Sequence, residues 1–251
     1  MKRFRVFFLL LLIIAAPMTF AWEEDMLNLK VPTNLKAGSI VVDIEHRLLI
    51  GFNGANFDLV LRGVIWSKLE LYSSYAKYMY NPRDNTKNEF TIGASYAYFL
   101  PKILRGQVDV QFYNYEELTN NSKQNLFYQL SLQSEPILKT FIPVVNVAYD
   151  GDNQRFGYGA GFNIGFNISF GPIQRLSLIG EYFPIFNRNS TMLGSKNCFA
   201  AGLVLGTYGH HFMFLLGNSL EMGGRRLMLG APKNTMYFGF NIQRFLDLKT
   251  W

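Results

Sequence analysis

The sequence predicts an all-β protein, a transmembrane antiparallel up-and-down β-barrel of about twelve strands. Three observations carry this prediction. Large apolar and small polar residues alternate with period two over most of the chain, as they do in strands with two different faces. The alternating stretches are long, and membrane-spanning strands need ~9–11 residues where soluble strands usually have ~5–6. Charged residues make up only 17% of the 251 residues and aromatic residues 16%, a low charge for a soluble domain.

The N-terminus has the pattern of an export signal. Lys2, Arg3 and Arg5 precede an apolar run over residues 6–16, and small residues near Ala21 provide a cleavage point. The apolar run is too short for a spanning helix, so an uncleaved anchor is the weaker interpretation. We therefore expect a signal peptide over residues 1–21, a periplasmic lead-in segment without periodicity over 22–38, and a barrel domain over 39–251.

The alternating stretches define the expected strands. We expect them near residues 39–48, 56–63, 68–76, 89–100, 104–115, 125–135, 139–150, 155–168, 175–185, 197–207, 211–218 and 235–245.

The connections between these stretches alternate in length. The short ones are 64–67, 101–103, 136–138, 169–174 and 208–210. The long ones are 77–88, 116–124, 186–196 and 219–234, and 151–154 is an exception because it is short where a long loop is expected. An up-and-down meander places successive connections at opposite ends. This asymmetry is typical of outer-membrane barrels, which have short periplasmic turns and longer extracellular loops.

The stretch "RFGYGAGFNIGFNIS", residues 155–169, shows which face meets lipid. Phe156, Tyr158, Phe162, Ile164 and Phe166 alternate with glycine and asparagine. A soluble sandwich or lipocalin-type barrel also alternates, but its polar face meets bulk water and carries many charges. Here that face is small and uncharged, so we expect the aromatic residues to face lipid. The opposing lumen wall is then Gly157, Gly159, Gly161, Asn163 and Gly165, the roomiest side of the barrel.

The charges on the polar face gather in the first strands. We expect the lumen to be lined by Asp43, Glu45, Arg47, Asp58, Arg62, Glu70, Asp109, Gln129, Asn163 and Gln243. Two interpretations stay open. The charges form a structural network of ion pairs shielded from bulk water, or they line the path of a solute as charged rings do in selective pores. Tyr72, Tyr113 and Phe127 share this face and predict partial filling of the lumen.

No catalytic or metal-binding motif is present. The sequence has neither HExxH nor GxSxG, and its only histidines are His46, His210 and His211. The single cysteine, Cys198, lies in an apolar stretch and is expected to be a small core residue. The glycine-rich run at 157–161 continues as a strand, whereas a nucleotide loop leads into a helix. We expect no enzyme activity, no cofactor and no metal.

Three segments, "LKVPTNLKAGSIVVDIEHRLL", "GANFDLVLRGVIWSKLELYSSY" and "YFGFNIQRF", resemble a known family. It is the Bacteroidota family described as a membrane-bound β-barrel domain of unknown function. The sequence departs from the family pattern at Leu48, where phenylalanine is usual, and at "VIWSK", which lacks the acidic turn residue. The resemblance implies a barrel and supplies no substrate or catalytic residue. The matching positions are Pro32, Thr33, Leu35, Lys36, Gly38, His46, Arg47, Ala55, Asn56, Leu61, Gly63, Leu69, residues 238–242 and Arg244.

These observations predict a monomeric outer-membrane protein with a narrow lumen, a candidate channel for the passive passage of small solutes. The alternative is a non-conducting structural or partner-binding barrel that acts through its extracellular loops, and a soluble periplasmic β-protein is a third possibility. The expected partners are outer-membrane lipid, lipopolysaccharide and the barrel-assembly machinery. The net charge of +6 falls to about +3 without the three cations of the signal, which is too mild to indicate nucleic acid.

Overall fold

The computed structural model describes residues 26–33, 35–49, 55–66, 68–78, 86–100, 103–117, 119–137, 140–166, 168, 170–185, 196–231 and 234–248. The expected signal peptide lies outside the described residues, as do the first residues of the lead-in segment and most of the expected long loops 77–88 and 186–196.

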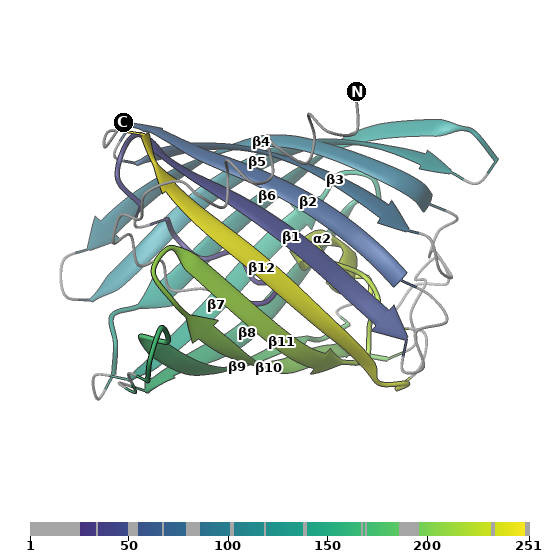
Figure 1. Ribbon diagram of the computed structural model, residues 1–251. Helices are drawn as coiled ribbons and strands as arrows, with labels where there is room; N and C mark the ends of the chain where they lie inside the picture. Colours follow the sequence, from purple (N-terminus) through teal and green to yellow (C-terminus); the bar gives the residue numbers. More distant parts are fainter. Residues whose placement is uncertain are drawn as a thin grey trace, which may run out of the picture.

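Twelve strands form one closed barrel, which confirms the predicted fold class (Figure 1). Each strand pairs antiparallel with its neighbours in sequence, and β1 closes the barrel by pairing with β12 from Ser39↔Asp247 to Leu49↔Tyr237. Closure satisfies the backbone of every strand without leaving an open edge, which a β-structure in lipid requires. The strands are β1 (Ser39–Leu49), β2 (Ala55–Trp66), β3 (Leu69–Tyr78), β4 (Thr86–Leu100), β5 (Leu104–Glu117), β6 (Ser122–Ser134), β7 (Phe141–Asp150), β8 (Arg155–Phe166), β9 (Arg175–Phe183), β10 (Cys198–Gly206), β11 (His210–Gly217) and β12 (Tyr237–Asp247).

The alternation of side chains has the predicted orientation. On β8, Phe156 is 66% exposed and Tyr158 is 40% exposed on the outer surface, whereas Gly159 and Asn163 on the opposite face are buried. The same outward apolar face recurs on β4 and β5, where Ile92 and Val108 are exposed. The outside of the barrel is therefore apolar, and the inside carries the small and polar residues.

The connection between β5 and β6 differs from the prediction. The expected long loop 116–124 is mostly strand, because the two strands pair as far as Glu116↔Ser122. Asn120 has φ 60°, a left-handed conformation that asparagine tolerates better than most residues, so a tight turn closes the hairpin. Salt bridges between strand ends, such as Lys123 Nζ to Glu117 Oε1 at 2.7 Å, help to extend the pairing. The polar sequence here is the tip of a long hairpin that projects beyond neighbouring strands (Figure 1).

Two segments that are not part of the wall pack inside it. The first is residues 26–38, which we call the strap. The second is residues 218–231, which we call the plug, and it contains the short helix α2 (Gly223–Leu227) (Figure 1). Leu27 and Leu29 of the strap are buried, as are Leu227 and Met228 of the plug.

Both placements correct the sequence-based expectations. The lead-in segment does not stay outside the barrel, and the long connection 219–234 does not reach outward as a free loop over its described residues. The physical reason is that both segments carry large apolar side chains, whose burial contributes roughly 1.5–3 kcal/mol each.

A hydrophobic core forms between these two segments and one side of the wall. Leu29 of the strap and Met228 of the plug belong to the same buried cluster as Phe127, Ile179 and Phe183 from the strands. Cys198 also belongs to this cluster and is 1% exposed, as expected for a core cysteine. No helix in the described part of the chain is long and apolar enough to cross a membrane. The barrel thus has an apolar exterior and a second apolar core within its lumen.

Candidate functional site

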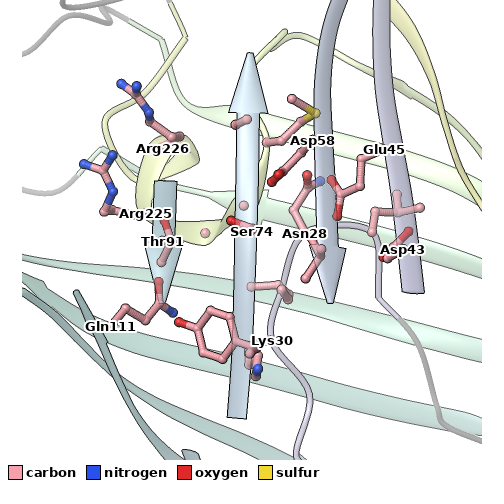
Figure 2. A pocket seen from close by; sticks show the side chains of 18 of the residues that line it. Asn28, Lys30, Asp43, Glu45, Asp58, Ser74, Thr91, Gln111, Arg225 and Arg226 are labelled. Atoms are coloured by element: carbon pink, nitrogen blue, oxygen red, sulfur yellow. The ribbon is translucent and has the colours of Figure 1, made fainter. Parts of the chain in front are cut away.

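A cavity of about 170 Å³ remains inside the barrel beside the strap and the plug. Its wall comes from β1 to β6 with one residue of β12, and the strap and α2 close its other sides. Figure 2 shows acidic side chains on one side of this space and the two arginines of α2 on the other, with Lys30 of the strap below them. Two other pockets inside the barrel are much smaller, at about 10 and 20 Å³.

The acidic side of the cavity comes from β1 and β2. Glu45 and Asp58 are directly opposite each other in the strand register, and Asp43 points to the same face two residues before Glu45. Gln243 Nε2 donates a hydrogen bond of 2.8 Å to Asp43, and Arg47 lies 3.3 Å from Glu45. Like charges on neighbouring strands repel each other. The wall of β1 and β2 is therefore the negative end of the cavity.

A second group of charges is centred on Glu70 of β3. Lys30 Nζ of the strap lies 2.6 Å from Glu70 Oε1, and Arg62 Nη1 lies 3.5 Å from Glu70 Oε2. Glu70 is fully buried, so its charge requires these partners. Lys30 also lies over the ring of Tyr72, 4.4 Å from its centroid. This group fastens the strap to the charged side of the wall.

Arg225 and Arg226 of α2 form the third group. Both arginines pair with Glu89 of β4, Arg226 Nε at 3.0 Å, and Arg225 also lies 3.8 Å from Asp150. The Arg225 guanidinium lies 3.9 Å from the centroid of the Tyr113 ring. Buried guanidinium groups need such carboxylate and aromatic partners, and an arginine offers them in a planar, fixed geometry. This group fastens the plug to the wall.

The space in front of the glycine-rich face of β8 is the reverse of what the sequence predicts. It is not the roomiest side of the lumen, because the strap and the plug pack directly on it. A Cβ atom added at Gly159 would lie 2.7 Å from Leu29, and one at Gly157 would lie 2.8 Å from Met228 Sδ. At Gly161 the added atom would meet the backbone oxygen of Gly180 at 2.5 Å. The glycines are there because the inner segments approach the wall closely.

Polar side chains on the same side bind the backbone of the strap. Glu181 of β9 accepts hydrogen bonds from the backbone N–H groups of Asn28 and Leu29, at 2.8 and 3.0 Å. Asn146 of β7 accepts one from the N–H of Lys30 at 2.7 Å and donates one to its carbonyl at 2.8 Å.

Polar side chains from two further strands also bind the backbone of the strap. Gln107 of β5 accepts from the N–H of Thr33 at 2.7 Å, and Asn241 of β12 donates to the carbonyl of Leu27 at 3.2 Å. Over the described residues 26–33, no backbone hydrogen bonds join the strap to the wall, so these side chains take the place of backbone partners.

All ten residues predicted to line the lumen are buried or half-buried inside the barrel. Those that border the cavity are Asp43, Glu45, Asp58, Arg62, Gln129 and Gln243. The other four are Arg47, Glu70, Asp109 and Asn163. Arg47 binds Asn241 at 2.7 Å, and Asp109 accepts from Gln111 at 2.6 Å. Ion pairs occupy several of these charges, and their action on a solute remains a prediction.

Sequence reasoning missed the residues of the strap and the plug. Lys30 stands in a segment with no period, and the two arginines stand in "GGRRLMLG", an apolar stretch interpreted as a loop. Buried Asn146 and Glu181 were also missed. The available signal was the apolar character of both segments, which is unusual for solvent-exposed connections.

The histidines are not gathered at this site. His46 is on the outer face, where its ring stacks on Phe240 at 4.7 Å, and His210 lies 3.0 Å from Arg244. Across the described ranges, no group of three or more histidine, cysteine, aspartate or glutamate residues is arranged to hold a metal ion.

Comparison with solved structures supports the architecture. The KdgM porin shares 12% sequence identity, with a TM-score of 0.51, and the match covers 81% of this chain and 98% of the porin. The NanC porin shares 8% identity, with a TM-score of 0.53, and the match covers 82% of this chain and 98% of the porin. At these identities the likeness is one of fold.

Comparison with known sequences gives the family. No curated protein matches the chain. Residues 124–246 match the family described as "Membrane bound beta barrel domain (DUF5777)", a range that includes the closing-strand motif "YFGFNIQRF". The family resemblance inferred from the sequence is confirmed, and residues 124–246 are similar to the membrane bound beta barrel domain of this family.

Proposed function

We propose that the protein is an outer-membrane barrel that passes small polar solutes through the cavity beside the strap. The observation that carries the proposal is the charged cavity enclosed by β1 to β6 within a barrel whose outer face is apolar. Polar linings with charges of both signs hold water and ions, and charged side chains set the selectivity of many pores. Two solved structures of similar fold, KdgM and NanC, are porins, which is consistent with this function.

Conductance across a planar lipid bilayer tests this proposal. We expect each inserted barrel to give a small, steady current that rises with salt concentration, because twelve strands enclose a narrow lumen already partly filled. The matched control is the Glu116→Gln variant, since Glu116 lies at an exposed strand end outside the cavity and its loss should leave the current unchanged. Silence over many verified insertions would contradict the proposal.

A second candidate is a non-conducting structural barrel. The observation in its favour is that the strap and the plug fill the β8 side of the lumen with a packed core. Of the loops expected to bind a partner, 219–234 is folded inward over its described residues. Among the described connections, the projecting β5–β6 hairpin is then the surface that we propose for a partner. A barrel that inserts but remains silent, and whose hairpin captures a partner from the envelope, would support this candidate instead.

The protein's place in the cell is part of the proposal. We propose export through a signal peptide over residues 1–21, insertion by the barrel-assembly machinery, and a monomer in contact with outer-membrane lipid and lipopolysaccharide. We propose no enzyme activity, because several charged residues in and beside the cavity are engaged in ion pairs, Lys30 with Glu70 and Arg226 with Glu89.

Fractionation and N-terminal sequencing test this placement. The protein should sediment with outer membranes, show heat-dependent mobility in detergent gels and begin at Trp22. Recovery from the soluble periplasm would end the membrane proposal.

A further inference from the structure

The row of polar side chains that binds the strap has the chemistry of a peptide-binding site. Four side chains from four different strands, Gln107, Asn146, Glu181 and Asn241, each bind a backbone group of the strap. They also bind neighbouring side chains, as Asn241 binds Arg47 and Glu181 binds Asn28. Their exposed fractions are 0%, 0%, 4% and 1%. Since buried polar groups need partners, a ligand that replaces the strap must offer the same donors and acceptors.

Backbone recognition makes part of the site tolerant of sequence, while Asn28 and Lys30 of the strap also bind the wall through their side chains. Asn146 provides both an acceptor and a donor to a single residue, Lys30, in the way that a neighbouring strand would. Any residue except proline presents the same N–H and carbonyl groups, so this contact does not depend on the lysine side chain. Recognition through main-chain hydrogen bonds combined with a few side-chain pockets is a recurring way of binding peptides.

The glycine face of β8 supplies the side-chain pocket. Leu29 packs within contact distance of Gly159 and Gly161 and beside Phe183, where no larger wall residue fits. One apolar side chain at this position is therefore favoured in a ligand. The cavity borders the strap from Met26 to Val31, so the space beside the strap is continuous with the space that the strap occupies.

We propose that the lumen holds a binding site for short peptides in an open, non-helical conformation, that the strap is its intramolecular occupant, and that short peptides are the solutes admitted. The transport part rests on the proposed passage of small solutes, whereas the binding part stands by itself. A free peptide competes with the strap for the same side chains. The strap's attachment beyond Lys36, which is exposed at the mouth of the barrel, keeps its local concentration high.

Peptide exchange in the full-length protein tests the binding site. A recognition sequence for a specific protease, inserted at the exposed Lys36, allows the strap to be cut in the folded barrel in detergent. A fluorescent peptide with the sequence of residues 26–34, "MLNLKVPTN", is then added, and its bound fraction is measured by fluorescence anisotropy. We expect binding only after cleavage, with unchanged heat-dependent mobility of the barrel.

Methylated peptides provide the matched controls. N-methylation at Lys30 removes a donor that Asn146 accepts, and we expect it to weaken binding about tenfold or more. N-methylation at Val31 adds the same bulk at a residue whose N–H contributes none of the six contacts, and it should weaken binding much less. An alanine-based nonapeptide with leucine at the Leu27 and Leu29 positions should displace the probe, and maltotetraose should not.

The outcomes separate the two proposals. Absence of exchange after complete cleavage overturns the binding site and makes the strap a fixed part of the fold. Displacement by the strap sequence alone overturns the general recognition of peptides. Peptide binding to a barrel that shows no conductance would contradict solute passage and support the binding site. Conductance without peptide binding would contradict the binding site and support solute passage.

Discussion

The two sides of the lumen obey the same alternation of residues but are built in different ways. On the side of β1 to β4, charged residues point inward and leave a cavity of about 170 Å³ between the wall and the strap. On the side of β7 to β11, glycines and apolar residues point inward and are covered by the strap and the plug. A small side chain on the wall is therefore not a sign of open space. It is equally the sign of a close neighbour.

The strap and the plug are also attached differently on the two sides of the lumen. On the charged side they are fastened by ion pairs at Glu70 and Glu89. On the glycine side they are held by packing and by hydrogen bonds to the backbone. Each kind of attachment can be broken separately.

The largest effect is expected for Glu89→Ala, on the charged side. The change leaves Arg225 and Arg226 buried without their shared carboxylate, and losing one partner of a buried pair costs roughly 3–5 kcal/mol. We expect the plug to leave its place and the bilayer conductance to rise. Glu116→Ala removes an exposed pair with Lys87 and serves as the control, with a cost of at most about 1 kcal/mol. Equal conductance in the two variants would show that the pair does not hold the plug.

On the glycine side, Gly161→Ala should lower the free energy of unfolding by about 1–3 kcal/mol, the usual cost of overpacking. The added methyl group would lie 2.6 Å from Met26 Cε and 2.7 Å from Leu29 Cδ1 of the strap. It would also lie 2.5 Å from the backbone oxygen of Gly180, which cannot turn away as a side chain can. Gly63→Ala is the matched control, since an added Cβ there has nothing within 4 Å. Denaturant titration of the two refolded barrels makes the comparison, and equal midpoints would contradict the close packing of the inner segments.

A smaller effect is expected for Asn146→Ala, which removes both bonds to Lys30. We expect a loss of about 1 kcal/mol, because water from the neighbouring cavity restores part of the bonding. The strap should then open more often, and trypsin should cut after Lys30 more quickly, as followed by mass spectrometry. Val147→Ala, on the outer face of the same strand, should leave the cleavage rate unchanged. Protection that stays the same in both variants would remove Asn146 from the attachment.

The smallest effect is expected for Asp58→Asn in the negative wall of the cavity. Removing one of several charges should lower the cation-to-anion permeability ratio by about twofold. The reversal potential in a potassium chloride gradient measures this ratio. The Glu116→Gln barrel should keep the wild-type potential. A potential unchanged by Asp58→Asn would place the conducting path away from β1 and β2.

The wall of the barrel could be predicted from the sequence, but its contents could not. Period-two alternation determines which residues of β8 face outward, so Phe156 and Tyr158 were correctly assigned to the outer face. The strap and the plug carry no period that shows their destination. Asn146 is one polar residue among many on the inner face. It binds the backbone of Lys30, which lies 116 positions earlier in the chain, and the sequence gives no sign of this contact.

The strap also sets an order for assembly. Its carbonyl at Leu27 is bound by Asn241, a residue 214 positions later in the chain and part of the last strand. Contacts of such long range form late, because the entropy of closing so large a loop must be offset first. The contact between the strap and β12 can therefore form only once the last strand is in place. The barrel closes and encloses its own N-terminal segment in a single event.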